Sequence, residues 1–226
     1  MTRLKAILFD LHGTIAYLEN PISEIEVSDY LFSKGYEISP QQLKATWFFV
    51  AMVDYPKYGY KSWHSYLSRI FWRLKTKVDK ETLDSIVKLF QSSSYHLYPD
   101  GIDAVINAKS NGFKTAIVTT IASFQFKKAI RPIRNYLDLI VTGYEARCDK
   151  SNPKIYKKTL ELLGINPNEA VMIGDNVYVD IFLPKKLGIH AILLNRYKKS
   201  VKCKQAEAVV SNLSQALEIA ILFCLR

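Results

Sequence analysis

The chain has 226 residues, of which 49% are hydrophobic and 23% charged. This composition excludes a disordered or fibrous protein, and the length allows one large domain or a core with a smaller inserted domain. The net charge of +10 comes from lysines and arginines that are scattered along the chain rather than gathered in one run. We therefore expect a small anionic substrate and no nucleic-acid partner.

The cysteines Cys148, Cys203 and Cys224 are widely spaced and form no CxxC pair, which favours a reducing compartment over a disulfide framework. The N-terminus enters a strand-like run without a signal-peptide pattern. No uncharged apolar stretch reaches the roughly 18 residues that would span a bilayer. These features predict a cytoplasmic protein without a membrane partner, as a monomer or a homodimer.

The first expected element is a buried parallel strand. The apolar run 4–9 stops at Asp10, and Gly13 follows three residues later, which is typical of a strand that ends in a tight loop. From 21 to 95 the pattern becomes helical, with Ser39 and Pro40 as a helix start and no convincing strand. Helices are expected at about 61–74 and 79–91.

After the turn-forming segment 98–101, short apolar strands alternate with helices. This alternation predicts a parallel sheet covered on both faces. We expect strands at 115–118, 137–141, 170–173, 191–194 and 208–210, and helices at 101–110, 123–130, 153–163, 178–187 and 216–225.

The fold class is thus predicted to be α/β, with a Rossmann-like parallel sheet core and an inserted helical cap. Residues 1–16 and 96–226 are assigned to the core, and residues 17–95 to the cap. A cap placed after the first strand would cover the carboxyl edge of the sheet, where open α/β sheets bind their ligands.

Four groups of reactive side chains follow the carboxyl ends of expected strands. They are Asp10 in FDLHGT, Thr119 in IVTT, Lys150 in DKSNPKIY, and Asp175 with Asp180 in IGDNVYVD. In this order, with a helical insert after the first, they resemble the four signature motifs of the haloacid dehalogenase superfamily with its type 1 cap. The likeness spans nearly the whole chain apart from the cap. It implies a hydrolase that works through an aspartyl-ester intermediate.

The resemblance assigns the role of nucleophile to Asp10. Gly13 lets the backbone turn tightly before Thr14, so that main-chain N–H groups face an anion. The resemblance also implies that the hydroxyl of Thr119, with Thr120 beside it, contacts the substrate. Lys150 would neutralise negative charge at the nucleophile and in the transition state.

Asp175 and Asp180 are expected to bring two further carboxylates close to Asp10, and a hard divalent cation with oxygen ligands relieves the repulsion between such groups. The resemblance implies Mg²⁺ held by the carboxylates of Asp10 and Asp175 and by the main-chain carbonyl of His12. Asp180 would bind the ion directly or orient a water. A dehalogenase would not need this ion.

Position 12 departs from the family's phosphatase pattern. The related metal-dependent phosphatases carry a second aspartate there, which protonates the leaving alcohol and then activates water, whereas this chain has His12. A dehalogenase releases halide and needs no such acid. The placement of Tyr156 and Asn176, and the cap segment 41–47 that ends in Trp47, also resemble 2-haloacid dehalogenases. These three residues are predicted to contact the substrate.

We therefore expect first a 2-haloalkanoic acid dehalogenase. Two features oppose it: Ser39 stands where those dehalogenases place the arginine that grips the substrate carboxylate, and Gly174-Asp175 is the metal-binding form. The alternative is a Mg²⁺-dependent phosphatase of small phosphorylated metabolites with His12 as acid and base, since imidazole exchanges protons near neutral pH. A second alternative is a non-catalytic protein that binds a phosphorylated ligand.

A receiver-type signalling domain also combines an aspartate with a threonine and a lysine. Its aspartate follows the third strand, however, and a long helical insert is foreign to its fold. His64, His96 and His190 share no spacing typical of a metal site, so we assign them no function.

Overall fold

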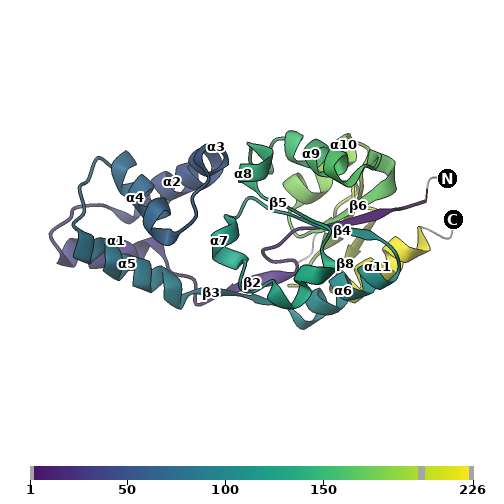
Figure 1. Ribbon diagram of the computed structural model, residues 1–226, viewed down its shortest axis with the longest axis horizontal. Coiled ribbons are helices and arrows are strands. Elements are labelled where there is room, and N and C mark those ends of the chain that lie inside the picture. Colours follow the sequence, from purple (N-terminus) through teal and green to yellow (C-terminus); the bar gives the residue numbers. More distant parts are fainter. Residues whose placement is uncertain (1–2, 198–201, 224–226) are drawn as a thin grey trace.

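The computed structural model describes residues 3–197 and 202–223, and it consists of an α/β core and a helical cap (Figure 1). The core sheet holds six strands in the order β5-β4-β1-β6-β7-β8, and all their pairings are parallel. The predicted α/β class is confirmed. The strands are β1 (Ala6–Phe9), β4 (Lys114–Val118), β5 (Leu139–Val141), β6 (Ala170–Gly174), β7 (His190–Leu194) and β8 (Ala208–Val210).

Strand β1 lies in the middle of the sheet, and its apolar residues are all buried. Phe9 is level with Ile117 of β4 on one side and with Ile173 of β6 on the other. The chain adds β4 and β5 on the first side and then crosses to add β6, β7 and β8 on the second. The carboxyl end of β1 is therefore the switch point at which such sheets bind ligands.

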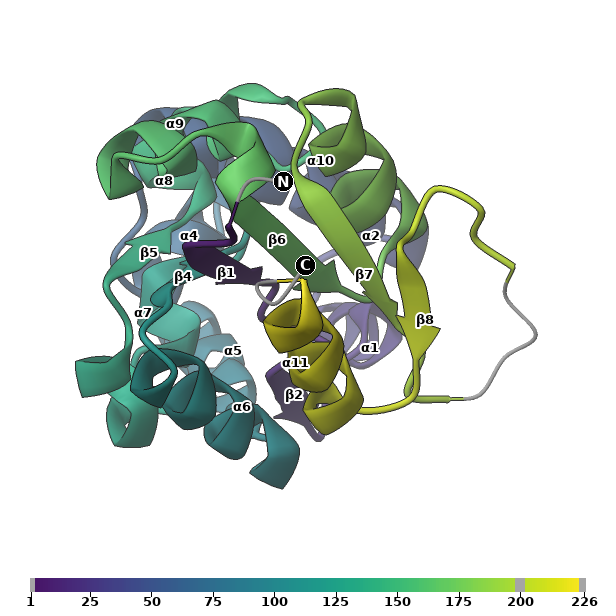
Figure 2. The same ribbon diagram turned by 90° about the vertical axis from the view of Figure 1, so that its right-hand side faces the viewer.

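Helices cover both faces of the sheet, as Figure 2 shows. Ile7 and Phe9 of β1 pack in the same apolar cluster as α6 and α11, whereas Ala6 and Leu8 pack in the cluster with α9 and α10. Each fully buried Ile, Leu or Phe contributes about 1.5–3 kcal/mol. The core helices are α6 (Pro99–Ser110), α7 (Ser123–Phe126), α8 (Gly143–Ala146), α9 (Lys154–Leu163), α10 (Leu183–Lys186) and α11 (Leu213–Leu222), with 3-10 turns at Arg131–Tyr136 and Pro167–Glu169.

The cap has an apolar core of its own, which includes Leu31, Leu67 and Ile86. Serines begin several of its helices because a serine oxygen accepts a hydrogen bond from a main-chain N–H that has no partner inside the helix. Ser39, for example, accepts from the N–H of Gln42. The cap helices are α1 (Glu24–Ser33), α2 (Pro40–Phe49), α3 (Tyr55–Tyr58), α4 (Trp63–Arg73) and α5 (Lys80–Ser92).

Two short strands join the cap to the core. Strands β2 (Ala16–Glu19) and β3 (Ser94–Leu97) form an antiparallel ribbon (Figure 1). The expectation of no strand between 21 and 95 is wrong at its end, because β3 begins at Ser94. The four residues of β3 are mostly polar or half exposed, so their sequence lacks the apolar signal of a core strand, and pairing with β2 defines them.

Two π-helical turns replace parts of expected regular helices. Turn η1 (Val50–Asp54) continues α2 in the cap, and turn η4 (Val177–Phe182) precedes α10 in the core. A proline follows each turn by two residues, Pro56 and Pro184 respectively. Proline lacks the N–H of a regular helix and crowds the preceding turn, and a locally widened turn relieves this.

Other expected elements differ at their ends. The helix expected at 123–130 stops at Phe126 and gives way to a 3-10 turn that contains Pro132. The final helix ends at Leu222, and Cys224 lies outside the described residues, whereas Cys148 and Cys203 are free thiols. Within 3–197 and 202–223, no helix has the length and apolar character needed to cross a membrane.

Candidate active site

A cavity of about 680 Å³ opens at the carboxyl edge of the sheet, between the core and the cap. It brings together most of the residues that the sequence singled out, from four separate loops. Its walls are Asp10, His12, Phe48, Met52, Tyr95, Thr119, Thr120, Ile121, Asp149, Lys150, Ser151, Asp175, Asn176, Val179 and Asp180.

Asp10 follows β1 directly and is 8% exposed. One of its carboxylate oxygens, Oδ1, accepts a hydrogen bond from Lys150 Nζ at 2.5 Å, and the other, Oδ2, accepts from the hydroxyl of Thr14 at 3.3 Å. Its main-chain N–H donates to the carbonyl of Ile173 in β6 at 2.9 Å. The carboxylate predicted as nucleophile is thus held from both sides at the edge of the cavity.

Lys150 connects two carboxylates. Its Nζ lies 2.5 Å from Asp10 Oδ1 and 2.5 Å from Asp180 Oδ1, and the residue is buried. Burial alone would lower the pKa of Lys150, but the charges of Asp10 and Asp180 outweigh it and raise the pKa above its ordinary value. The lysine is therefore a fixed positive charge beside Asp10.

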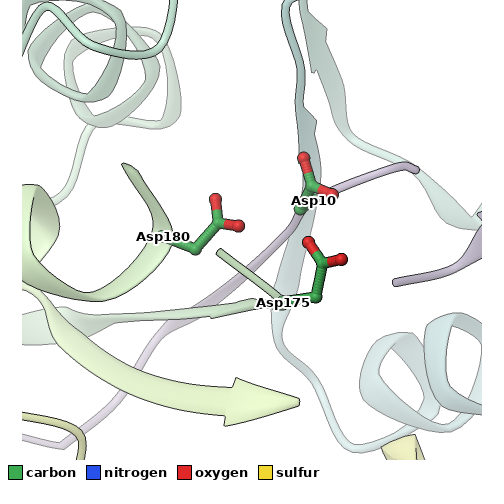
Figure 3. A group of neighbouring side chains, drawn as sticks. All are labelled: Asp10, Asp175 and Asp180. Carbon is green, nitrogen blue, oxygen red and sulfur yellow. The ribbon is translucent and has the colours of Figure 1, made fainter. Parts of the chain in front are cut away.

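Asp10, Asp175 and Asp180 turn their carboxylates toward a common space (Figure 3). One ligand oxygen from each lies within 4.8 Å of the others. Two glycines make room for this group. A Cβ on Gly13, which has a φ of +78°, would lie 2.3 Å from Asp175 Oδ2, and a Cβ on Gly174 would lie 2.3 Å from Asp180 Cγ. Gly13 is therefore required both by its backbone conformation and by the carboxylate beside it.

The crowding changes the acidity of these groups. Burial raises the pKa of Asp180 to about 6, with the charge of Asp10 adding to this and Lys150 opposing it. Asp175 is exposed as a whole residue, but partial desolvation of its carboxyl group and the charge of Asp180 likewise raise its pKa. Carboxylates that share a small space repel one another, and hard oxygen donors in this arrangement suit Mg²⁺. The donor set of Asp10 and Asp175 therefore fits the expected ion, while Asp180 is engaged by Lys150.

His12 is exposed on the cavity wall, two residues after Asp10. Its ring meets the edge of the Tyr95 ring, with centroids 5.8 Å apart and an interplanar angle of 87°. Tyr95 lies on β3, so the imidazole stands where the ribbon between cap and core reaches the site. His12 therefore lines the same cavity as Asp10 and contacts the ribbon that leads to the cap.

Thr119, Thr120 and Asn176 also line the cavity. The N–H of Ile121 donates to the hydroxyl oxygen of Thr119 at 3.2 Å, which orients that hydroxyl. Asn176 has a structural task as well, because its side-chain oxygen accepts from the N–H groups of Tyr178 and Val179 and begins turn η4. This turn carries Asp180.

Two predicted substrate contacts lie elsewhere. The hydroxyl of Tyr156 donates to the carbonyl of Val179 inside the core, so the structure gives this tyrosine the task of holding η4. Trp47 packs against Phe90 in the cap, with ring centroids 4.7 Å apart. Its neighbour Phe48 faces the cavity instead, together with Met52 one helical turn later.

Sequence reasoning also missed Arg196, which follows β7. Its guanidinium donates to Asp100 from both Nη atoms at 2.9 Å and to the main-chain carbonyl of Thr14 at 2.6 Å, and it stacks 4.0 Å from the centre of the Tyr98 ring. Thr14 in turn bonds Asp10. An arginine far along the chain therefore supports the turn whose Thr14 holds Asp10, and no local motif signals this role.

Known proteins share both the sequence pattern and the fold. A glyceraldehyde 3-phosphate phosphatase of Methanopyrus kandleri is 34% identical over 103 residues, which cover 45% of this chain and 44% of that one. An (S)-2-haloacid dehalogenase of Burkholderia cepacia is 24% identical over 202 residues, 85% of this chain and 84% of that one. The alignments to the curated glyceraldehyde 3-phosphate phosphatases cover about half the length of those relatives.

A crystal structure described as a HAD phosphatase from Thermococcus onnurineus matches with a TM-score of 0.66 at 24% identity, over 96% of this chain and 97% of that one. At this identity the likeness concerns the fold alone. A sequence profile of haloacid dehalogenase-like hydrolases matches residues 4–188, a span that contains Asp10, Thr119, Lys150, Asp175 and Asp180. The chain belongs to the haloacid dehalogenase-like hydrolases.

Proposed function

We propose that the protein is a Mg²⁺-dependent phosphatase that hydrolyses small phosphate monoesters through a phosphoaspartyl intermediate on Asp10. The observation that carries this proposal is the convergence of three carboxylates, Asp10, Asp175 and Asp180, within 4.8 Å of one another beside a single lysine. A phosphate dianion entering this negative site would be repelled unless a divalent cation neutralised the carboxylates.

The chain's own residues supply the remaining steps. One carboxylate oxygen of Asp10 attacks phosphorus, the bond from phosphorus to the ester oxygen breaks, and that oxygen takes a proton from His12. Water then gives a proton to His12 and attacks phosphorus, which releases inorganic phosphate and restores Asp10. Lys150 and the hydroxyl of Thr119 stabilise the charge on the phosphoryl oxygens. Mg²⁺ bound at Asp10 and Asp175 would supply further charge neutralisation to the phosphoryl group.

The dehalogenase expected first from the sequence has weaker support. A 2-haloacid presents a carboxylate, and no arginine lines the described walls of the cavity. Ser39, which stands at the position of the carboxylate-binding arginine, begins helix α2 and does not line the cavity. The acidic group at Asp175 would add repulsion. The relatives include both activities by name, so an assay must separate them.

The deciding experiment is a pair of assays on the same preparation. Phosphate release from p-nitrophenyl phosphate with Mg²⁺ is expected to stop when EDTA is added, and halide release from 2-chloropropionate is expected to be absent. Mg²⁺ binding followed by calorimetry provides a second readout, which Asp175→Asn should abolish. Halide release that survives EDTA would overturn the phosphatase assignment in favour of the dehalogenase.

The role of His12 has its own test. Nitrophenolate leaves without protonation, whereas an alkoxide needs a proton, so His12→Ala should slow hydrolysis of an alkyl phosphate by about 10²-fold or more and that of p-nitrophenyl phosphate much less. Measuring kcat for both esters in the variant and the parent protein gives the ratio. An equal loss for both esters would remove His12 from the role of general acid.

A further inference from the structure

We infer that the natural substrate, on the proposed phosphatase reaction, is a phosphate monoester whose alcohol carries an apolar chain or ring, and that this part binds in a side pocket beneath the cap. The inference rests on the proposed function for the reaction, and on a separate set of residues for the choice of substrate. Those residues lie on helix α2, turn η1 and the loop after β4, with further ones on α3, α4 and α7.

Charge is unevenly distributed over the main cavity. The charged side chains of Asp10, Asp149, Lys150, Asp175 and Asp180 all come from the core. Three of them, Asp10, Asp175 and Asp180, bring their carboxylates within 4.8 Å of one another. The cap contributes Phe48 and Met52, which are both apolar. A substrate would therefore place its phosphate on the core side and an apolar group against the cap.

A side pocket of about 160 Å³ adjoins this apolar wall. It shares Met52, Thr120 and Ile121 with the main cavity, so the two spaces meet above the loop that follows β4. Its described walls are all uncharged: Trp47, Ala51, Met52, Tyr55, Tyr66, Thr120, Ile121, Ala122 and Gln125. An anionic or strongly polar group would lose its hydration there without gaining a charged partner.

The spacing of residues along α2 and η1 explains how the cap lines both the main cavity and the side pocket. Phe48 and Met52 are four residues apart and share one face, which lines the main cavity. Trp47 and Ala51 have the same spacing on the adjacent face and line the side pocket. Trp47, which the sequence predicted as a substrate contact, therefore meets the substrate in this inference at the end of the alcohol and away from the phosphate.

The hydroxyl groups in the side pocket do not give it a charge. The hydroxyl of Tyr55 forms a hydrogen bond with Thr142 Oγ1 at 2.7 Å. Burial also raises the pKa of Tyr55 and that of Tyr66 above the ordinary value for tyrosine, so both remain neutral. The pocket thus offers aromatic and aliphatic surface to a ligand.

The size of the pocket separates this substrate class from a short polar one. The alcohol of glyceraldehyde 3-phosphate, the substrate in the name of several relatives, would leave the apolar walls uncovered. Each methylene that enters an apolar pocket contributes about 0.8 kcal/mol, which is about fourfold in binding. The affinity for a substrate should therefore depend on the length of the apolar chain of its alcohol.

The test is a series of n-alkyl phosphates from ethyl to hexyl, assayed with Mg²⁺. Their leaving groups have similar acidity, so chain length acts mainly through binding. We expect kcat/KM to rise about threefold to fourfold per methylene and then to level off when the pocket is full. A kcat/KM that stays flat or falls with length, while p-nitrophenyl phosphate is still hydrolysed, would overturn the inference and leave the proposed function standing.

Variants locate the effect. Ala51→Phe fills the side pocket and should flatten the length dependence, whereas Val53→Phe is the matched control, because Val53 lies in the same turn, is 48% exposed and lines neither space. Equal length dependence in both variants would contradict the assignment of the pocket.

Binding of n-alkylphosphonates to the unaltered protein, measured by calorimetry with Mg²⁺, supplies a readout that needs no turnover. Tighter binding of butylphosphonate than of ethylphosphonate by at least tenfold supports the subsite even if the chemistry proves different. Equal binding of the two rejects the subsite.

Discussion

The two π-helical turns, η1 in the cap and η4 in the core, have the same backbone conformation, but the aspartate in each turn has different partners. Each precedes a proline by two residues and places side chains on the cavity: Met52 from η1, and Val179 with Asp180 from η4. Each turn also contains one aspartate, and both aspartates are buried. Turn η1 thus contributes an apolar side chain to the cavity wall, whereas turn η4 contributes a charged one.

The difference lies in the partners of the two aspartates. Asp54 of η1 points into the cap, where Arg69 Nε lies 2.6 Å away and Arg73 bonds both carboxylate oxygens at 2.5 and 2.6 Å. Asp180 of η4 shares the one charge of Lys150 with Asp10. The carboxylate of Asp54 is therefore neutralised by two guanidinium groups within the cap. The carboxylate of Asp180 lines the cavity and shares its one cationic partner with Asp10.

The pKa values follow this division. Burial would raise the pKa of Asp54, but the guanidinium groups of Arg73 and Arg69 outweigh it and hold the pKa below the ordinary value. Burial raises the pKa of Asp180 to about 6, because one lysine serves two carboxylates there. Exchanging aspartate for asparagine at each position should therefore give opposite patterns of activity and stability.

The largest expected effect is on activity, from Asp180→Asn. Lys150 would lose one of its two carboxylate partners and its fixed position beside Asp10, so we expect kcat for p-nitrophenyl phosphate to fall about 10²-fold to 10³-fold. The free energy of unfolding should stay equal or increase, since a buried carboxylate with an unfavourable charge is removed. Steady-state kinetics and urea unfolding measure the two quantities. A lower free energy of unfolding with an unchanged kcat would contradict this prediction, because Asp180 would then have the role expected of Asp54.

A second prediction concerns Arg196, which reaches Asp10 only through Thr14. Arg196→Gln should lower kcat about tenfold, equal to a loss of roughly 1.4 kcal/mol of transition-state stabilisation, and change KM less. Arg134→Gln is the matched control, because Arg134 also bonds a main-chain carbonyl, that of Leu137 at 3.0 Å, but outside the site. Added guanidinium ion should restore part of the activity of Arg196→Gln and should have no effect on the control.

In the cap, Asp54→Asn should reduce stability instead. Removing the carboxylate leaves two guanidinium groups without their partner, so we expect the free energy of unfolding to fall by about 2–4 kcal/mol. The loss is below that for a fully buried pair because Arg69 and Arg73 keep 20% and 29% of their side-chain surface exposed. The kcat for p-nitrophenyl phosphate should change by less than about threefold, and a larger change would tie the cap acid to the chemistry.

The smallest expected effect is the pH dependence of this stabilisation. Because the folded pKa of Asp54 lies below its ordinary value of 3.8, its contribution is complete above that value and disappears as the pH falls through the folded pKa. The difference in unfolding free energy between the parent and Asp54→Asn should be constant from about pH 7 to 5 and shrink below about pH 4. Urea titrations at four pH values test this. A difference in unfolding free energy that grows as the pH falls would contradict the lowered pKa of Asp54.

The core, and the meeting of the candidate site residues in one cavity, could be predicted from the sequence because the positions of these residues depend on strands. Asp10 follows β1, Thr119 follows β4 and Asp175 follows β6, and β1 lies between the other two strands in the sheet. The three side chains therefore lie together at the carboxyl edge, where they line one cavity. Lys150 is identified by the sequence motif around it, DKSNPKIY. In each case a short run of residues and a parallel sheet are sufficient.

The cap wall could not be predicted in the same way. Trp47 and Phe48 are adjacent, and one residue turns a helix by about 100°, so resemblance to a cap segment does not decide which ring meets the reacting atoms. The task of Arg196 depends on contacts with Thr14 and Asp100, which are distant in sequence. Only the packed fold supplies that information.

The covalent role of Asp10 is the central claim, and rapid quenching followed by peptide mass spectrometry tests it most directly. When the protein is mixed with Mg²⁺ and excess p-nitrophenyl phosphate and quenched in acid, we expect one phosphoryl group on the peptide that contains Asp10, and none in Asp10→Asn. Phosphate release at the normal rate without any phosphoryl group on Asp10, or full activity in Asp10→Asn, would contradict the account.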